Sequence, residues 1–214
     1  MKSNLLSKLN YTHPVAYELL DIVAHFPDIY MSRFNKINIK TGDGLILELG
    51  CGTGRSSYIY HGLEGVNVIN LDINKAFVSY GYKKGRFINP VVGSAYQLSF
   101  HDNIFDKIVI PDAFHHILEH ELLFNECRRV LKSGGELIIF EVVMVMEKKV
   151  TNTIINHYAD GVIWNLNVEG FRLKIDRLGD EFGFQQLDFH ITKRENTIMG
   201  LTGGIDVLVK LVKK

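Results

Sequence analysis

The stretch that decides the fold is residues 45–55, which read LILELGCGTGR. Its first half is an apolar run that predicts a buried β-strand, and its second half is a loop with glycine at every second position. Glycine permits backbone angles that a β-carbon forbids, and it lets a ligand lie directly against the main chain. The polar, aromatic stretch at 55–60 predicts a helix whose free N–H groups and positive dipole end point back toward that ligand.

The spacing of the glycines argues against a dinucleotide. The usual dinucleotide-binding loop has the pattern G-x-G-x-x-G. Here the third glycine, Gly54, comes one position early, and Arg55 stands where that pattern has its last glycine. A nicotinamide-dependent oxidoreductase is therefore the weakest of the functions that the loop suggests.

A second apolar run, VNVINLD at residues 66–72, ends at an acidic residue, Asp72. Asp72 follows Gly50 by 22 residues (72 − 50), close to the interval of about 20 at which a βαβ unit presents a carboxylate to ribose hydroxyls. One carboxylate can accept charge-assisted hydrogen bonds from two hydroxyls. The loop and the acid together predict a nucleoside-bearing cofactor.

Four motifs in order give the sequence a family resemblance. Residues 48–54 with Asp72 resemble motif I and the following acidic motif of class I S-adenosylmethionine-dependent methyltransferases, in particular the UbiE-like small-molecule enzymes. Residues 92–106, VGSAYQLSFHDNIFD, resemble the segment that in this family begins Gly-Asp-Ala. Residues 129–137, RVLKSGGEL, resemble its Leu-Lys-Pro-Gly-Gly turn. The resemblance extends over about 45–140.

The resemblance implies S-adenosylmethionine as the cofactor. The glycine loop would meet its amino-acid portion, Asp72 its ribose and Ile73 one face of its adenine. Glu48 would engage its ammonium group, directly or through water, or would bond the loop's own N–H groups. Ser94 stands where the family has aspartate, and its hydroxyl can still make one hydrogen bond to adenine. The predicted cofactor-binding residues are Glu48, Gly50, Cys51, Gly52, Gly54, Asp72, Ile73, Ser94, Ala95 and Pro111.

Residues 111–117, PDAFHHI, follow a predicted strand at the point where the family places residues beside the reactive methyl group. His115 and His116 are the candidate general bases, because an imidazole with a pKa of about 6.5 can accept a proton at neutral pH. Alternatively, the pair anchors the start of a helix. Asp112 follows the single proline, so the segment lacks the Asp/Asn-Pro-Pro-aromatic tetrad of amino-methylating DNA enzymes.

A metal site is not predicted. His116 and His120 are four residues apart and can share one helix face, with Glu119 between them. Their order is not His-Glu-x-x-His, and the sequence offers no evident third ligand.

Composition narrows the class of protein. A chain of 214 residues with 46% hydrophobic and 22% charged residues fits one well-packed globular domain. The 24 basic and 24 acidic residues balance, which disfavours a nucleic-acid partner. Cys51 and Cys127 suggest neither a metal site nor a disulfide framework. With no apolar signal core and no stretch long enough to span a bilayer, we expect a soluble cytoplasmic protein without a membrane partner.

Strand and helix signals alternate from residue 45 onward, which predicts a parallel sheet with right-handed crossovers and helices on both faces. The predicted strands are 45–49, 66–71, 87–92, 107–110 and 136–143, and the helices between them are 55–62, 74–82 and 119–131. Helices at 148–165 and 170–182 and strands at 184–191 and 205–211 follow. The predicted fold is α/β, a Rossmann-like seven-stranded, mostly parallel sheet whose antiparallel C-terminal hairpin the resemblance implies.

The domain organisation follows from these elements. We expect one methyltransferase domain over 1–214, with an N-terminal helical lid at 1–44, a cofactor-binding core at 45–214 and an acceptor-pocket segment at 148–182. Pro14 begins the first lid helix, and Pro27 ends it or begins a second segment. The aromatic residues that either face the pocket or pack in the core are Tyr11, His13, Tyr17 and Tyr30 of the lid and Trp164 of the acceptor segment.

The predicted function is methyl transfer to nitrogen or oxygen of a small molecule or small peptide. An amine acceptor needs only to be neutral, whereas a hydroxyl needs a base. A non-catalytic S-adenosylmethionine-binding sensor or assembly protein is the alternative, because the glycine loop and Asp72 are compatible with binding alone. The sequence specifies neither the methyl acceptor nor the oligomeric state.

Overall fold

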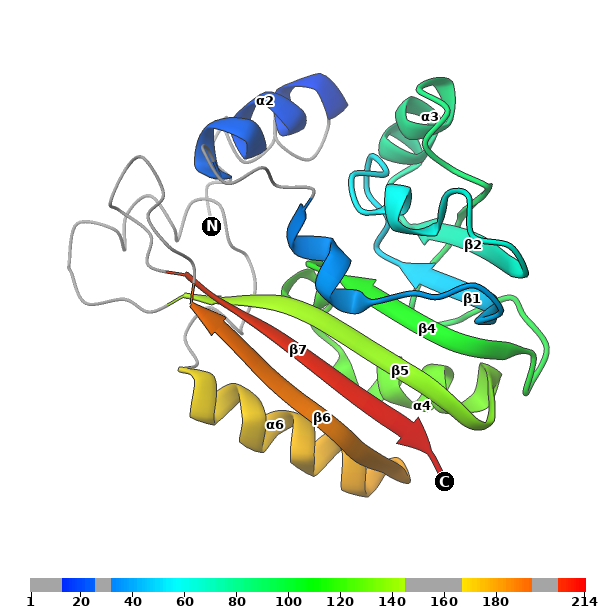
Figure 1. The fold of residues 1–214 in the computed structure, drawn as a ribbon, viewed down its shortest axis with the longest axis vertical. Coiled ribbons are helices and arrows are strands. Elements are labelled where there is room, and N and C mark those ends of the chain that lie inside the picture. Colours follow the sequence, from blue (N-terminus) through cyan, green and yellow to red (C-terminus); the bar gives the residue numbers. More distant parts are fainter. Residues whose placement is uncertain (1–12, 26–31, 145–166, 194–203) are drawn as a thin grey trace.

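The computed structural model describes residues 13–25, 32–144, 167–193 and 204–214. Its centre is a seven-stranded sheet in the order β3-β2-β1-β4-β5-β7-β6 (Figure 1). The strands β1 to β5 pair in parallel, and β7 is antiparallel to both β5 and β6. The predicted fold class is confirmed. The strands are β1 (Gly44–Leu49), β2 (Val66–Asp72), β3 (Asn89–Val92), β4 (Phe105–Pro111), β5 (Leu131–Met144), β6 (Phe184–Lys193) and β7 (Gly204–Lys213).

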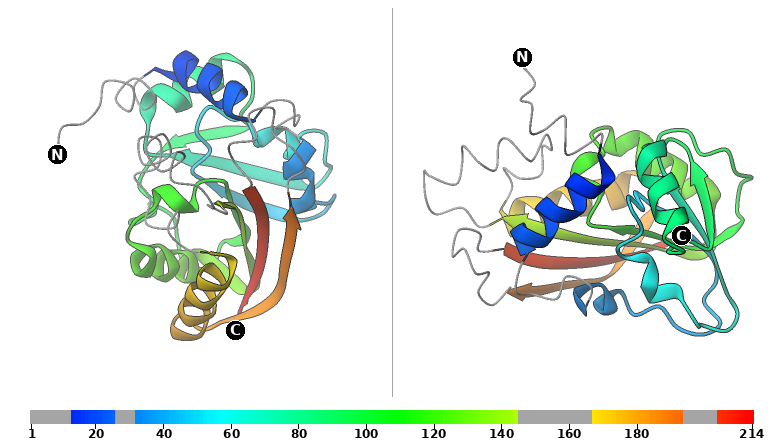
Figure 2. Two further views of the ribbon diagram at one scale, coloured as in Figure 1. Left: turned by 90° about the vertical axis from the view of Figure 1, so that its left-hand side faces the viewer. Right: turned by 90° about the horizontal axis from the view of Figure 1, so that it is seen from above.

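Helical segments cover both faces of this sheet. The α-helices are α2 (Pro14–His25), α3 (Lys75–Lys83), α4 (His120–Val130) and α6 (Val168–Glu181), and the 3-10 turns are η1 (Ser32–Ile37), η2 (Ser57–Tyr60) and η3 (Phe114–His116). In the left-hand view of Figure 2, α4 and α6 lie on one side of the sheet and η1 on the other. Within the described parts of the chain, no helix is long and apolar enough to cross a membrane.

The alternation of side chains along the strands produces two cores. On β1, Leu47 and Leu49 pack in the core that α4 and α6 cover, whereas Ile46 packs with Phe34 and Ile37 of η1 on the opposite face. Successive residues of a strand point to opposite faces, so a strand buried on both sides needs a continuous apolar run. The strand at the start of the decisive stretch meets this requirement.

One predicted element is wrong. The helix expected at 55–62 is only the 3-10 turn η2, because Ser56 and Ser57 turn inward and donate hydrogen bonds to buried Glu48. Four residues do not align enough peptide groups to form a macrodipole, so the expected helix dipole behind the ligand site is absent from this turn. The helix predicted at 148–165 lies outside the described residues.

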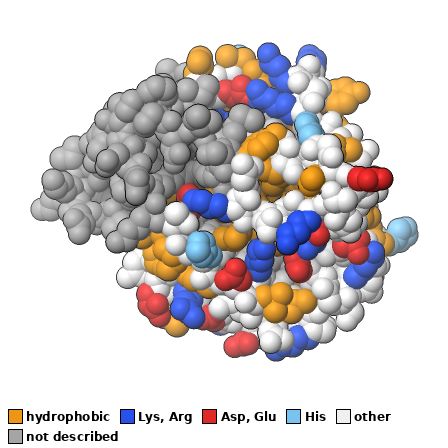
Figure 3. All heavy atoms as spheres, viewed as in Figure 1, with side chains coloured by type: hydrophobic (Ala, Val, Ile, Leu, Met, Phe, Trp, Pro, Cys, Tyr) orange, Lys and Arg blue, Asp and Glu red, His pale blue; other side chains and the backbone are white. Residues whose placement is uncertain are grey.

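The remaining elements agree with the prediction to within a few residues, except at the start of β5. That strand begins at Leu131, which pairs with Phe105 before the register resumes with Glu136 opposite Lys107. Basic and acidic side chains are interspersed on the face of the molecule shown in Figure 3.

Candidate functional site

A cleft of about 290 Å³ lies at the carboxyl ends of the parallel strands. The loops after β1, β2, β3 and β4 line it, together with Tyr17 of α2 and Phe34 of η1. The crevice outside the carboxyl ends is where open α/β sheets bind their ligands. Of the predicted cofactor-binding residues, those that line this cleft are Gly50, Cys51, Gly52, Asp72, Ile73, Ser94, Ala95 and Pro111.

The three glycines of the loop are required for different reasons. All three have positive φ angles, of 73° at Gly50, 53° at Gly52 and 83° at Gly54. A Cβ at Gly50 would clash with Ala113, and one at Gly54 would lie 2.8 Å from the ring of Phe87. A Cβ at Gly52 would meet no atom within 4 Å. Gly50 and Gly54 therefore serve packing, and Gly52 leaves open space at the wall of the cleft.

The N–H groups of this loop are already engaged within the protein. Those of Gly50 and Cys51 both donate to the carbonyl of Leu71, at 2.8 and 3.1 Å, and that of Gly54 donates to the carbonyl of Cys51 at 2.8 Å. The N–H of Gly52 donates to Asp72. A phosphate site needs such donors to point at the ligand, so this loop is unsuited to a pyrophosphate.

Asp72 is the charged group at the centre of the cleft wall. Its Oδ2 accepts the N–H of Gly52 at 2.8 Å, and its Oδ1 accepts the N–H of Asn74 at 2.7 Å. Burial raises the pKa of Asp72, and these two hydrogen bonds oppose the rise. Each carboxylate oxygen has a second acceptor position. Asp72 is thus oriented by the main chain with capacity for two hydroxyl donors, which fits the nucleoside that the sequence implies.

Glu48 lies behind the loop and does not line the cleft. Its carboxylate accepts hydrogen bonds from the hydroxyls of Ser56 and Ser57 and from the amide of Asn70. Burial raises the pKa of Glu48, and the three donors oppose the rise. Glu48 thus supports the loop through side chains of Ser56, Ser57 and Asn70. Its engagement of an ammonium group, directly or through water, stays a prediction, and these donors differ from the loop N–H groups that were the alternative. The sequence analysis missed its partners, although Asn70 lies opposite Glu48 in the β1–β2 ladder and is a polar residue within a largely apolar strand.

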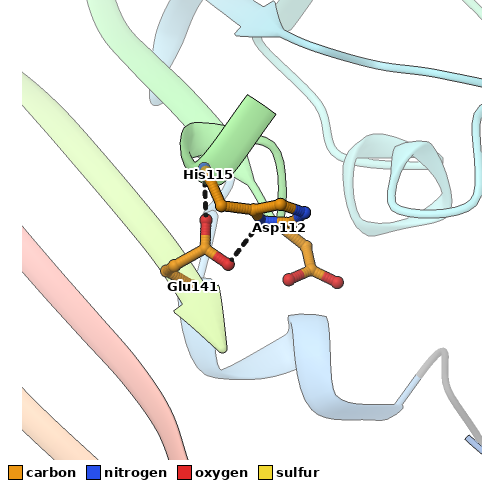
Figure 4. A group of neighbouring side chains, drawn as sticks. All are labelled: Asp112, His115 and Glu141. Carbon is orange, nitrogen blue, oxygen red and sulfur yellow. Dashed lines mark hydrogen bonds and ion pairs between the residues drawn. The ribbon is translucent and has the colours of Figure 1, made fainter. Parts of the chain in front are cut away.

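The opposite wall carries a buried histidine–glutamate pair (Figure 4). Nδ1 of His115 lies 2.8 Å from Oε1 of Glu141, and the backbone N–H of His115 donates to Oε2 at 3.1 Å. The N–H of Val142 also donates to Oε1, at 2.8 Å. Glu141 is fully buried. Burial raises its pKa, and the charge and hydrogen bond of His115 oppose the rise.

His116 lines the cleft, whereas His115 does not. The two rings are in contact, with their centroids 3.8 Å apart and their planes tilted by 50°. Although the His116 side chain has exposed surface in the cleft, the surrounding protein removes hydration and, together with His115, lowers the pKa of His116.

Two groups of residues invite a comparison with metal sites. Ligand atoms of Asp112, His115 and Glu141 all lie within 4.8 Å of one another. The two oxygens of Glu141 already accept three N–H groups, which leaves little capacity for a cation. The second group is His116, Glu119 and His120, which the sequence analysis considered. His120 of this group is buried, its ring centroid lies 4.3 Å from that of Phe114, and it does not line the cleft.

Helix α2 is attached to the glycine loop through Arg86. Glu18 of α2 forms an ion pair with Arg86, and Nη1 of Arg86 also donates to the carbonyl of Thr53 at 3.1 Å. The ring of Tyr17 contacts that of Phe77 of α3, with centroids 4.9 Å apart and planes tilted by 41°, and Tyr17 lines the cleft. Among the other aromatic candidates, His13 is exposed. Tyr11, Tyr30 and Trp164 lie outside the described residues.

Comparison with known proteins gives matches to methyltransferases. Residues 47–139 match the family model described as a methyltransferase domain. The chain is 26% identical over 145 residues to demethylmenaquinone methyltransferase of Thermotoga maritima, an alignment that covers 66% of this chain and 63% of that protein. It is 27% identical over 209 residues to the ubiquinone/menaquinone biosynthesis C-methyltransferase UbiE of Cellvibrio japonicus, covering 82% and 76%.

A solved structure shares the fold. Phosphoethanolamine N-methyltransferase 2 of Haemonchus contortus, solved with S-adenosyl-L-methionine, matches with a TM-score of 0.70 and 14% sequence identity, over 99% of this chain and 60% of that one. The chain thus spans less than two thirds of the length of this structure and of the Thermotoga relative.

Proposed function

Residues 47–139 form a class I S-adenosylmethionine-dependent methyltransferase domain of the UbiE-like group, and on that premise we propose that the protein transfers a methyl group from S-adenosylmethionine to a small-molecule acceptor. The observation that carries the proposal is the pairing of Asp72 with the open position at Gly52 in one cleft. Asp72 offers acceptor capacity for a ribose diol, and Gly52 leaves room for a ligand against the main chain.

The use of the loop's N–H groups supports this cofactor over a dinucleotide. The N–H groups of Gly50, Cys51 and Gly52 are engaged by Leu71 and Asp72 and are poorly placed to bind a pyrophosphate. A ligand whose end near the loop is an ammonium group suits such a wall better, because it needs carbonyl acceptors. NAD carries the first kind of group and S-adenosylmethionine the second.

When bound, S-adenosylmethionine supplies a methyl group on a sulfonium centre, and its transfer leaves S-adenosylhomocysteine. Asp72 would hold the ribose, the loop the amino-acid end, and Ile73, Ser94 and Ala95 the adenine. Tyr17 lies over the cleft on α2, where it helps to exclude water from the site. Pro111 and His116 line the remaining wall, beside which the acceptor would bind.

The acceptor atom is the finer part of the proposal. The sequence analysis predicts nitrogen or oxygen of a small molecule or small peptide. Carbon is the second candidate, because the Cellvibrio relative is named a C-methyltransferase and the Thermotoga relative acts, by its name, on demethylmenaquinone.

The test begins with cofactor binding. We expect isothermal titration to detect binding of S-adenosylhomocysteine, and we expect this ligand to raise the midpoint of thermal unfolding. NAD should neither bind nor change the midpoint. Turnover is then measured as release of S-adenosylhomocysteine with 1,4-naphthalenediol, phosphoethanolamine and a short lysine peptide. Absence of S-adenosylhomocysteine binding would refute the proposal. Tight binding without methylation of these acceptors or of a metabolite extract would favour the non-catalytic sensor.

A further inference from the structure

A cation and an anion line the cleft in addition to Asp72. Arg55 lines it from the loop after β1, and Asp112 lines it from the turn after β4. Both side chains are half-buried. Among the described residues that line the cleft, Arg55 is the only lysine or arginine. The cleft therefore combines a guanidinium and a carboxylate with the carboxylate of Asp72 that fits a ribose.

The two loops that carry Arg55 and Asp112 are in contact. β1 and β4 are neighbouring parallel strands, so their carboxyl ends open onto the same part of the cleft. A Cβ at Gly50 would clash with the Cβ of Ala113, the residue after Asp112. This close approach places the turn of Asp112 beside the glycine loop, where the amino-acid portion of the cofactor would lie.

The charges around Arg55 come from two elements besides its own loop and from the segment after α3. Burial lowers the pKa of Arg55, the charges of Glu18 and Asp112 oppose this change, and that of Arg86 adds to it. Glu18 is engaged by Arg86 and by the hydroxyl of Tyr80, and it does not line the cleft. Of these two carboxylates, Asp112 is therefore the one that shares the cleft with the guanidinium.

The carboxylate of Asp112 lies beside a second acidic side chain. Figure 4 shows it next to His115 and Glu141, and ligand atoms of the three residues all lie within 4.8 Å of one another. Burial raises the pKa of Glu141, and the negative charge of Asp112 raises it further. Two carboxylates this close repel each other. A positively charged ligand group at Asp112 would offset that repulsion.

The backbone at Asp112 is held in an uncommon conformation. Its φ angle is 56°, and its N–H donates to the carbonyl of Phe140 at 2.6 Å. Non-glycine residues adopt this left-handed region where their surroundings enforce it, and such residues cluster at ligand-binding sites. The position of the Asp112 carboxylate is thus set by its turn.

Building on the proposed function, we propose that Arg55 and Asp112 bind the α-amino acid end of S-adenosylmethionine, Arg55 through its carboxylate and Asp112 through its ammonium group. A planar guanidinium matches a carboxylate through parallel N–H donors. Guanidinium and carboxylate groups each make several hydrogen bonds, so both side chains can bind the ligand while they keep partners within the protein. Glu48, which the sequence analysis considers for the ammonium group, does not line the cleft.

The opposite charges of the pair make the intact amino-acid end a condition of tight binding. An analogue without the carboxylate cannot pair with Arg55, and an analogue without the ammonium group places no cation at Asp112. The cleft would therefore distinguish S-adenosyl compounds that carry both charges from those that carry one.

The test measures the Kd of three ligands for the full chain by isothermal titration. They are S-adenosylhomocysteine, the analogue that lacks only its carboxylate, and the analogue that lacks only its ammonium group. The wild-type protein should bind S-adenosylhomocysteine about 10-fold more tightly than either analogue, the size expected of a charge-assisted hydrogen bond at a partly buried site.

Two variants identify which charge each residue contacts. Arg55→Gln should weaken binding of the two ligands with a carboxylate by about 10-fold and leave the decarboxylated analogue within about threefold. Asp112→Asn should weaken binding of the two ligands with an ammonium group to the same extent and spare the deaminated analogue. Asparagine tolerates the left-handed backbone at this position, so the substitution removes the charge and keeps the turn. The crossed pattern isolates each pairwise interaction.

Arg177→Gln and Asp188→Asn, exposed residues that do not line the cleft, are the matched controls and should leave all three Kd values unchanged. Equal weakening of all three ligands by Arg55→Gln or Asp112→Asn would overturn the assignment of that residue. So would wild-type protein that binds the analogues as tightly as S-adenosylhomocysteine, a result that depends on no variant folding. If the wild-type protein binds none of the three ligands, the proposed function itself is refuted.

Discussion

The two walls of the cleft are built in different ways. The wall from β1 and β2 consists of two short segments, the glycine loop and the turn at Asp72, and is held mainly by main-chain hydrogen bonds. The wall from β4 and β5 is held by side chains, above all His115 of η3 and Glu141 of β5, which are 26 positions apart (141 − 115).

The residues of the first wall are constrained by backbone geometry, whereas those of the second wall are constrained by side-chain chemistry. At the first wall, a positive φ angle or a neighbouring atom dictates glycine at three positions. At the second wall, the side chain of Glu141 accepts the hydrogen bonds, so the arrangement depends on the identity of the side chains and not on a backbone conformation. A binding mode for one cofactor suits the first wall, and selection among acceptors suits the second.

The largest expected effect tests the wall from β1 and β2 at the carboxylate of Asp72. Asp72→Ala should raise the Kd for S-adenosylhomocysteine by about 100-fold or more, because two hydrogen bonds to a charged acceptor are worth about 3 kcal/mol or more together. It also removes the acceptor for the N–H of Gly52. Isothermal titration measures the change. Asp188→Ala on β6, an exposed aspartate, is the control; equal affinities of the two variants would contradict the role of Asp72.

A smaller effect separates backbone strain from ligand space. Gly52→Ala and Gly62→Ala both place a β-carbon at positive φ, at 53° and 76°, with no atom within 4 Å. Each should lose about 1 kcal/mol of unfolding free energy through the left-handed conformation, measured by urea denaturation. Only Gly52 lines the cleft, so only Gly52→Ala should also weaken S-adenosylhomocysteine binding, by about 10-fold if the methyl group overpacks the site. The same loss in Gly62→Ala would show that strain alone explains it.

The smallest expected effect concerns the link between α2 and the glycine loop. Arg86→Ala removes both the ion pair to Glu18 and the hydrogen bond to the carbonyl of Thr53. Because Arg86 is about one-third exposed, the loss should be about threefold in Kd for S-adenosylhomocysteine, in the range of partly exposed ion pairs. Arg177→Ala, which removes exposed pairs to Glu121 and Glu181, should leave the Kd unchanged. If both variants bind equally well, α2 is not coupled to the loop.

The fold could be predicted because its signals are local. Apolar runs that end in Gly50 or Asp72 mark strands buried on both faces, and the intervals between them leave room only for parallel crossovers. The helix predicted at 55–62 failed because Ser56 and Ser57 have a partner, Glu48, that lies on another element. Hydrogen bonds from these two hydroxyls to a buried carboxylate hold the segment in a conformation other than an α-helix.

The part of the candidate site that depends on local sequence signals could be predicted, and the part that depends on contacts between distant residues could not. The demands of the backbone identified the glycines of the loop, and the end of an apolar run identified Asp72. Of these residues, Gly50, Gly52 and Asp72 line the cleft, whereas Gly54 does not. Glu141 was not among the predicted site residues, because nothing in the sequence around it identifies His115 as its partner. Side-chain pairs across strands depend on register, which only the assembled sheet supplies.

The strand order has a consequence for how the chain reaches this structure. β6 precedes β7 in the sequence, yet β7 lies between β6 and the rest of the sheet. β6 therefore has nowhere to pair until β7 arrives, and β5, which ends at Met144, must wait for a segment that starts at Gly204. Closing so long a loop is slow. During that interval β5 presents an unpaired apolar edge, which makes the half-assembled chain the species most prone to aggregate.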